Sequence, residues 1–291
     1  FVGDTVASAL LANDVNLVGR SFKYHRPRGI LGIGSEEPNA LISVHKGGKI
    51  DPNVRATTQE IYEGLIVTSQ NSWPSLKFDA LAINDILAPF FSAGFYYKTF
   101  MWPPRFWEAL YEPIIRRAAG LGKLEYEPDV DNYDQNFAFC DLLIIGGGPS
   151  GLFSALLAGR AGLDVILVDE NPKFGGRLLF ENTIIDGNHC LDWIQSCLGE
   201  LKSLKNVRLL SRATVFGIYD QGTFGVLERI SRHIQDSESD AVLDCFWRIV
   251  ASNCLLASGA IERHIAFGNN DRPGIMMASA VRGYLNHYGV A

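Results

Sequence analysis

The stretch DLLIIGGGPSGLFSALLAGR at residues 141–160 indicates the architecture of the second half of the chain. Its apolar start predicts a buried strand over 142–146, its glycines predict a tight turn, and a helix is predicted over 150–161. A second apolar strand is predicted over 164–168. Strand, glycine turn, helix and strand in this order open a doubly wound α/β domain. The 18 uncharged residues 142–159 reach the length of a membrane span, but the glycines and proline in their middle would break a spanning helix.

The glycine turn has the spacing Gly146-x-Gly148-x-x-Gly151. In such a turn the first glycine permits the sharp bend, the second lets the backbone approach a pyrophosphate, and the third lets the helix lie close to the strand. Pro149 and Ser150 start the helix, where free N–H groups and the positive end of the helix dipole favour phosphate. The pattern predicts a dinucleotide site at these five residues. A degenerate turn that binds nothing is the alternative.

Asp169 follows the second strand directly, 23 residues after Gly146. A carboxylate at this place can accept hydrogen bonds from both hydroxyls of an adenosine ribose. It would also repel a 2′-phosphate, which favours NAD or FAD over NADP. We take Asp169 and the adjoining Glu170 as cofactor-binding candidates. The choice between NAD and FAD stays open, because both present the same adenosine and pyrophosphate to the turn.

Three further segments complete the predicted site. A Gly-Gly-Arg turn over 175–177 follows the second strand, and a strand predicted over 247–256 ends in small residues that permit close backbone approach. This combination resembles the glutathione-reductase-like class of FAD/NAD flavoproteins, in which the segment matching 213–215 touches the adenine through its main chain. The cofactor-binding candidates from these segments are Gly176, Arg177, Thr214, Val215, Ala257, Ser258 and Gly259.

Residues 1–100 predict a small α+β domain. A helix is expected to begin after an N-cap at Thr5 or the residue before it and to end near Asn13. Short strands are predicted over 40–44 and 61–67. Loops rich in glycine, proline and asparagine separate these elements.

The glycine-rich loop of this domain has the spacing of plant-type 2Fe–2S loops, C-x4-C-x2-C. The ligand positions would be Leu31, Glu36, Asn39 and Thr57, and none of them is a cysteine. The sequence therefore predicts a ferredoxin-like β-grasp domain without a 2Fe–2S cluster, and no metal site.

A basic loop precedes the glycine-rich loop. It carries five basic or titratable side chains, those of Arg20, Lys23, His25, Arg26 and Arg28. Such a loop could bind a phosphate or an acidic partner surface. A solvated basic loop is the alternative.

An aromatic and acidic linker is predicted over 101–138, followed by a dinucleotide-binding domain over 139–291 that is truncated at its C-terminus. The segment 73–111 holds 12 of the chain's 32 aromatic residues. These aromatic side chains either pack on the two domains or form a partner-facing surface. Further elements are predicted as helices over 108–120 and 276–288 and as antiparallel strands over 207–210, 213–219 and 224–228.

Composition excludes several classes of protein. The 291 residues carry a net charge of −6, so nucleic acid is not an expected partner. Five cysteines without a CxxC pair argue against a disulfide framework and a structural zinc site, and favour the reducing cytoplasm. No signal peptide and no membrane segment are expected. Cys190 and Cys197 are expected to be inert on a helix, and Cys254 is expected in the core.

Four segments carry a wider resemblance. They are GDTVASALLAND at 3–14, GRSFKYHRPRGILGIGSEEPNAL at 19–41, DLLIIGGGPSGL at 141–152 and NNDRPGIM at 269–276. Together they resemble the alpha subunits of heterotetrameric sarcosine oxidases, along essentially the whole chain. The basic loop with its cysteine-free glycine framework and the NNDRPGIM segment are much more specific than the glycine turn.

The resemblance implies a subunit that works with beta, gamma and delta subunits. In that family FAD in the beta subunit oxidises sarcosine or a similar secondary amine, and FMN at the interface with the beta subunit passes electrons to oxygen. Folate bound by the rest of the alpha subunit captures the one-carbon product. The products are glycine, hydrogen peroxide, and formaldehyde or methylene-folate. The resemblance further implies NAD held structurally by Gly146, Gly148, Gly151 and Asp169, and it assigns no catalytic residue to this chain.

Other functions stay open at this point. A subunit of a related opine or amino-acid dehydrogenase would share the dinucleotide part. An FAD-dependent NAD(P)H reductase would be expected to have a second GxGxxG and a redox group such as CxxC, and this sequence contains neither. A non-catalytic assembly module, which holds partner subunits through residues 1–111, is compatible with the first function.

Overall fold

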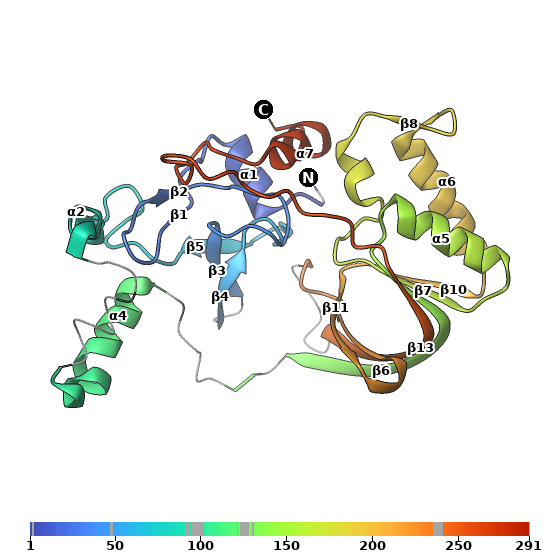
Figure 1. The fold of residues 1–291 in the computed structure, drawn as a ribbon, viewed down its shortest axis with the longest axis horizontal. Helices are drawn as coiled ribbons and strands as arrows, with labels where there is room; N and C mark the ends of the chain where they lie inside the picture. Colours follow the sequence, from blue (N-terminus) through green and yellow to red (C-terminus); the bar gives the residue numbers. More distant parts are fainter. Residues whose placement is uncertain are drawn as a thin grey trace. The chain divides into compact units, whose positions relative to one another are not determined.

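The computed structural model describes residues 1, 3–46, 49–90, 94, 102–120, 122, 128–129, 131–234 and 241–290. The chain forms two compact units (Figure 1). Unit 1 comprises Phe1–Glu127, Glu262–Val281 and Val290–Ala291, and unit 2 comprises Pro128–Ile261 and Arg282–Gly289. This division differs from the predicted one, because residues 262–281 fold with the N-terminal part of the chain.

Unit 1 begins with helix α1 (Val6–Ala12), as the sequence predicts. Thr5 caps it: Ser8 N donates to Thr5 Oγ1 at 3.2 Å, and Thr5 N donates to Ser8 Oγ at 3.0 Å. This reciprocal capping satisfies two backbone donors that a helix start leaves free. Two short strands, β1 (Gly19–Arg20) and β2 (Pro27–Arg28), pair with each other.

The main sheet of unit 1 is antiparallel, in the order β4-β3-β5. Its strands are β3 (Leu41–Lys46), β4 (Lys49–Arg55) and β5 (Ile66–Ser69). The strand predicted over 61–67 therefore begins only at Ile66. A turn precedes it, since Leu65 N donates to Tyr62 O and Gly64 has a φ of +78°.

Short helices follow the sheet: η1 (Ala80–Ala82), α2 (Ile83–Ile86), η2 (Ala88–Phe90), η3 (Pro104–Phe106), η4 (Trp107–Tyr111) and α4 (Glu112–Ala119). The helix predicted over 108–120 forms as η4 and α4, and Gly120 ends it with a φ of +66°. Trp73, Phe78 and Trp102 are strongly exposed members of the aromatic segment. Of the other aromatic residues in it, Phe91, Phe95, Tyr96, Tyr97 and Phe100 lie outside the described residues.

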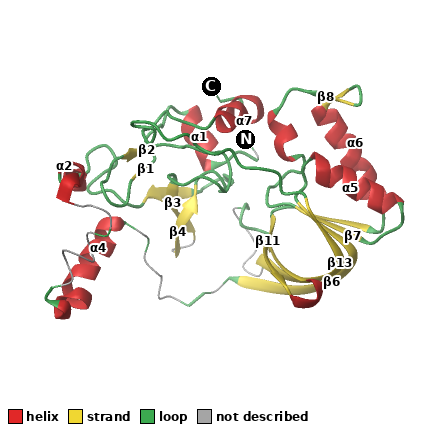
Figure 2. Cartoon of the chain, viewed as in Figure 1, coloured by secondary structure: helices red, strands yellow, loops and turns green. Residues whose placement is uncertain are grey.

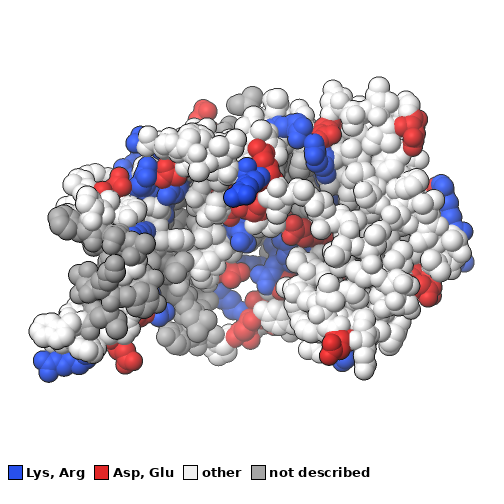
Figure 3. Space-filling view, viewed as in Figure 1, with Lys and Arg blue, Asp and Glu red and all other residues white. Residues whose placement is uncertain are grey.

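The residues of the basic loop are engaged within unit 1. Arg20 is buried, and its Nε donates to Leu76 O at 3.0 Å. Arg26 Nη2 lies 3.1 Å from the Asp271 carboxylate, and Arg28 Nη1 pairs with the other oxygen of the same carboxylate. These ion pairs connect the loop to the NNDRPGIM segment, which explains why residues 262–281 belong to unit 1. On the face shown in Figure 3, basic and acidic side chains are likewise interspersed.

An Asp271→Asn variant is expected to lose about 1–3 kcal/mol of unfolding free energy, because two partly buried guanidinium groups lose their shared anion. Burial already lowers the pKa of Arg28, so solvent compensates poorly for the missing carboxylate. Urea denaturation monitored by tryptophan fluorescence measures the change. Asp85→Asn is the control: Asp85 is 4.0 Å from Arg26 and half exposed, so the expected loss is below about 0.5 kcal/mol. Equal losses in both variants would contradict this assignment.

Unit 2 is built on one six-stranded mixed sheet in the order β10-β7-β6-β13-β12-β11. The strands β10 (Val207–Leu210), β7 (Val165–Val168), β6 (Asn132–Ile145) and β13 (Val242–Leu256) are parallel. The strands β11 (Ala213–Tyr219) and β12 (Thr223–Arg229), joined by η6 (Asp220–Gly222), complete the sheet in antiparallel pairing. The predicted antiparallel direction of 207–210 is therefore wrong, because this strand pairs with β7.

The helices of unit 2 cover one face of the sheet (Figure 2). They are α5 (Pro149–Arg160) and α6 (Cys190–Ser203), with the short elements η5 (Gly176–Phe180), β8 (Ile184–Ile185) and β9 (Asn188–His189) beside them. The last helix, α7 (Ala278–Tyr288), begins in unit 1, and its residues from Arg282 on belong to unit 2. Leu152, Leu201 and Leu167 are fully buried in the core between helices and sheet. A second core, with Leu143, Val226 and Ile249, lies on the other face of the sheet, because successive residues of a strand point to opposite faces. The predicted strand–turn–helix–strand order is confirmed.

Four cysteines are buried and Cys254 is exposed. The prediction of a core position for Cys254 is therefore wrong. Among the described strands, β12 pairs with β13 only as far as Val250, so the last residues of β13 have a neighbour on the β6 side alone. Burial raises the pKa of the Cys140 thiol to about 11, which fits an inert cysteine.

Candidate dinucleotide-binding site

The predicted site lies where three parallel strands of unit 2 end. Ile145 of β6 pairs with Val168 of β7 on one side and with Leu256 of β13 on the other. Gly146 N donates to Val168 O at 2.8 Å, and Ala257 N donates to Ile145 O at 2.7 Å. The carboxyl edge of such a sheet is where open α/β folds bind their ligands.

The glycines of the turn serve different purposes in the structure. Gly146 has a φ of +106°, and a Cβ at this position would overlap the carbonyl oxygen of Ala257. A Cβ at Gly151 would overlap the carbonyl oxygen of Gly146, so only glycine lets α5 lie this close to β6. Gly148 differs from both: no heavy atom lies within 4 Å of the position of its missing Cβ. The turn is therefore tightly packed at Gly146 and Gly151 and open at Gly148.

The N-terminus of α5 faces this open position. Gly148 is the N-cap, Pro149 occupies the first turn, and the first turn carries no acidic residue. The N–H groups of Ser150 and Gly151 belong to the first turn, where a helix supplies no carbonyl acceptors. These donors, together with the positive end of the helix dipole, suit a pyrophosphate.

Asp169 lies against the turn and is buried. Its Oδ2 accepts Gly147 N at 2.6 Å, and its Oδ1 accepts Asn171 N at 2.8 Å and Asn171 Nδ2 at 3.0 Å. Its backbone also holds β11 in place, since Ala213 N donates to Asp169 O at 2.8 Å. This places an acceptor-only side chain beside the glycine turn, as a ribose-binding carboxylate requires. Glu170 is exposed, and its carbonyl oxygen accepts Arg229 Nη2 at 2.7 Å.

The Gly-Gly-Arg turn packs on the glycine turn. Gly175 N donates to Gly147 O at 2.8 Å, and a Cβ at Gly176 would lie 2.9 Å from the Cα of Gly148. Arg177 has an exposed side chain whose Nε donates to Glu181 Oε1 at 2.7 Å. The backbone of this turn is thus part of the site, whereas the Arg177 guanidinium is paired with Glu181.

The remaining predicted residues lie at the margins. Thr214 is exposed on β11 and Val215 is half-buried. Ala257 contacts the turn through its backbone, and the exposed Ser258 and Gly259 follow it. Sequence reasoning missed Phe174, whose ring is buried against Gly147. It also missed Gly147 and Asn171, which bond the Asp169 carboxylate. An aromatic residue just before the Gly-Gly pair was the only available signal for Phe174.

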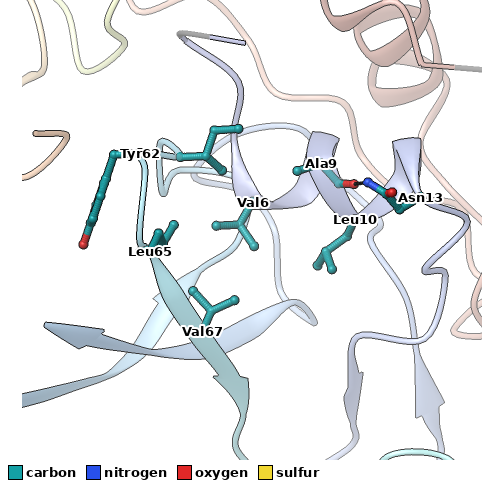
Figure 4. Close-up of a pocket in the computed structure, with 8 residues that line it drawn as sticks. Val6, Ala9, Leu10, Asn13, Tyr62, Leu65 and Val67 are labelled. Atoms are coloured by element: carbon teal, nitrogen blue, oxygen red, sulfur yellow. Dashed lines mark hydrogen bonds between the residues drawn. The ribbon is translucent and has the colours of Figure 1, made fainter. Parts of the chain in front are cut away.

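A different, apolar hollow of about 370 Å³ lies in unit 1 between α1 and β5 (Figure 4). Its lining residues are Val6, Ala9, Leu10, Asn13, Ile61, Tyr62, Leu65 and Val67. Burial raises the pKa of Tyr62, and no charged side chain lines the hollow. It lacks the charged groups that a nucleotide's phosphates need.

Two other kinds of site are absent from the described part of the chain. Within those residues, no three His, Cys, Asp or Glu side chains come together as metal ligands would. No described helix combines the length and apolar character needed to cross a membrane.

Two protein-family models match parts of the chain. Residues 1–72 match a 2Fe-2S iron-sulfur cluster binding domain, and residues 141–217 match an FAD dependent oxidoreductase. The solved structure of L-proline dehydrogenase from P. horikoshii is similar over 100% of this chain and 44% of the dehydrogenase chain, with a TM-score of 0.64 at 19% sequence identity. At this identity the likeness concerns the fold alone. The predicted fold class is confirmed.

Curated relatives extend over the whole chain. Sarcosine oxidase subunit alpha of Rhizobium meliloti (strain 1021) is 59% identical over 289 residues, which are 99% of this chain and 29% of the relative. The protein of the same name from Corynebacterium sp. (strain U-96) is 36% identical over 295 residues, 100% of this chain and 26% of the relative. The chain thus spans less than a third of the length of these relatives. Along nearly all of its residues, the chain is related to a segment of sarcosine oxidase alpha subunits.

Proposed function

We propose that this chain is the dinucleotide-binding part of a subunit in a flavin-dependent amine oxidase complex. The observation that carries the proposal is the open position at Gly148, which is the N-cap of α5 and directly follows Gly147, the donor to the Asp169 carboxylate. Free helix N–H groups suit the pyrophosphate, and the carboxylate suits the ribose. The residues present therefore fit the adenosine and pyrophosphate half of a dinucleotide.

We propose NAD as the nucleotide, with a structural role, and keep FAD as the alternative. The similarity to sarcosine oxidase alpha subunits supports NAD by way of the family resemblance. The match to an FAD dependent oxidoreductase model supports FAD. The residues of the turn contact only what the two nucleotides share, so geometry alone favours neither.

The reaction of the complex is likewise a proposal. By the family resemblance, the complex would convert sarcosine to glycine, formaldehyde or methylene-folate, and hydrogen peroxide. FAD in a beta subunit would oxidise the amine, FMN at the interface with that subunit would pass the electrons to oxygen, and gamma and delta subunits would complete the assembly. Folate would bind outside residues 1–291. Another secondary amine, such as an opine, is the alternative substrate, and we assign no catalytic residue to this chain.

The experiment is to denature the purified complex and to identify the released nucleotides by chromatography, for wild type and for Gly148→Ala. Gly148 has a φ of −72°, and its missing Cβ faces open space, so alanine should change the unfolding free energy by less than about 0.5 kcal/mol. The added methyl group would obstruct the pyrophosphate, and the nucleotide held by this chain is expected to fall at least about tenfold. Unchanged NAD and FAD content in the folded variant would overturn the proposal.

A further inference from the structure

The glycine-rich loop of unit 1 is the place where a cluster would sit in the family whose model matches residues 1–72. Four positions have the C-x4-C-x2-C…C arrangement, occupied by Leu31, Glu36, Asn39 and Thr57. The fourth does lie against the loop, because Thr57 Oγ1 donates to Gly34 O at 2.7 Å. None of the four side chains is a thiolate, so these residues do not fit an iron–sulfur cluster.

The Glu37 carboxylate lies inside this loop and is only 1% exposed. Its Oε2 accepts Leu31 N at 2.7 Å and Gly32 N at 2.6 Å. Its Oε1 accepts Asn39 N at 2.7 Å and Ala40 N at 3.0 Å. Four backbone donors from the two ends of the loop therefore converge on one buried side chain, and this arrangement suits the ionised carboxylate.

Glu36 completes the arrangement on the outer side of the loop. Its Oε1 accepts Ile33 N at 2.7 Å and Gly34 N at 3.0 Å. A Cβ at Gly32 or Gly34 would lie 2.7 or 2.8 Å from the same carboxylate. The two glycines that resemble the framework of a cluster loop thus provide room for a carboxylate here.

We infer that Glu37 is a built-in anion that takes the place of a cluster in this loop. Concave loops lined with successive backbone N–H groups bind anions, and many phosphates and iron–sulfur clusters are held in this way. In this chain the anion is part of the loop itself. Unit 1 therefore keeps the loop ordered without iron and carries no electron through it.

The loop also holds two neighbouring segments of unit 1 in place. Arg55 Nε donates to Glu37 O at 3.1 Å, which ties the loop to β4. Leu31 O accepts Met277 N at 2.9 Å, and a Cβ at Gly29 would lie 2.8 Å from the Cα of Pro273. The loop held by Glu37 is thus the surface on which residues 262–281 fold, and Glu37 acts as a positioning residue for that segment.

Amide hydrogen exchange on the complete chain tests the inference. In wild type, the amides of Leu31, Gly32, Asn39 and Ala40 should be protected although they lie outside helices and strands. In Glu37→Gln, an NH2 group replaces one acceptor, so at least two of these amides should exchange about tenfold faster or more. Glu36→Gln is the matched control and should affect only Ile33 and Gly34.

Two results would overturn the inference. The first is rapid exchange of the four amides in wild type, a measurement that needs no variant and stands even where Glu37→Gln does not fold. The second is uptake of one 2Fe–2S cluster per chain when wild type is incubated with ferrous iron and sulfide without oxygen, seen as visible absorption. Protected amides in wild type together with no such absorption are the expected results.

Discussion

A Gly151→Ala variant is expected to lose folding stability and nucleotide binding together. The added Cβ would overlap the carbonyl oxygen of Gly146, a backbone atom that cannot move aside as a flexible side chain can. Helix α5 must therefore shift away from β6, at a cost of about 3 kcal/mol or more in unfolding free energy. The shift also displaces the N–H groups of the first turn, and the nucleotide affinity should fall more than about hundredfold. Urea denaturation and titration with NAD and FAD measure the two effects.

Gly199→Ala is the matched control. Gly199 lies inside helix α6, and no heavy atom lies within 4 Å of the position of its missing Cβ. Alanine has the higher helix propensity, so this variant should gain about 0.5–1 kcal/mol and bind nucleotide as wild type does. If Gly151→Ala were as stable as wild type, the close approach of helix and strand described here would be wrong.

An Asp169→Ala variant is expected to show the second large effect. The buried carboxylate accepts one bond from Gly147 and two from Asn171, and its loss leaves the N–H of Gly147 without its acceptor. We expect a loss of about 1–3 kcal/mol in unfolding free energy. The ribose hydroxyls would lose their acceptor as well, which lowers the affinity by about thirtyfold or more. The nucleotide content per chain and the dissociation constant measure the second effect.

A Glu170→Ala variant distinguishes the roles of Asp169 and Glu170, which the sequence predicts together as cofactor-binding residues. Glu170 is exposed, and it accepts Arg229 Nη2 through its backbone carbonyl oxygen, which the substitution keeps. The variant should therefore bind nucleotide within about twofold of wild type, since surface substitutions have small effects. A larger loss of affinity in Glu170→Ala than in Asp169→Ala would assign the ribose to Glu170.

The core of unit 2 was predictable because its signals are local. Continuous apolar runs separated by glycines specify the end of β6, α5 and β7 between residues 142 and 168, and the structure places these elements within one or two residues of the prediction at most ends. The beginning of β6 was not predictable in this way. Asn132–Asn136 is polar, and it becomes a strand through its pairing with β13, more than a hundred residues later.

The direction of a strand and the unit to which a segment belongs also depend on residues that are distant in the sequence. The sequence of 207–210 is that of a short apolar strand, and only its pairing with β7 makes it parallel. Residues 262–281 follow the dinucleotide site along the chain but fold with unit 1, because Asp271 meets Arg26 and Arg28. Neither contact has a local sequence signature.

The candidate site was predictable in its backbone and less so in its side chains. Glycine spacing predicts the turn, since each glycine is required by a close approach or an open position that the structure contains. The spacing of residues along the chain does not predict side-chain geometry. It therefore predicts neither the ion pair of Arg177 with Glu181 nor the hydrogen bonds of Asn171 to Asp169. The role of Glu37 could not be predicted for the same reason. Its sequence context is that of an ordinary loop carboxylate, and only the structure shows that four backbone N–H groups donate to it.

The most direct test of the central claim is a crystal structure of the chain, alone or in its complex, with saturating NAD and, separately, FAD. The account predicts pyrophosphate oxygens within about 3 Å of the N–H groups at the start of α5, next to Gly148. It also predicts both hydroxyls of the adenosine ribose in hydrogen-bond contact with Asp169. Density for either nucleotide at this position would support the site, and density for one of them alone would decide between NAD and FAD. A turn without density at saturation, or a nucleotide bound elsewhere on the chain, would contradict it.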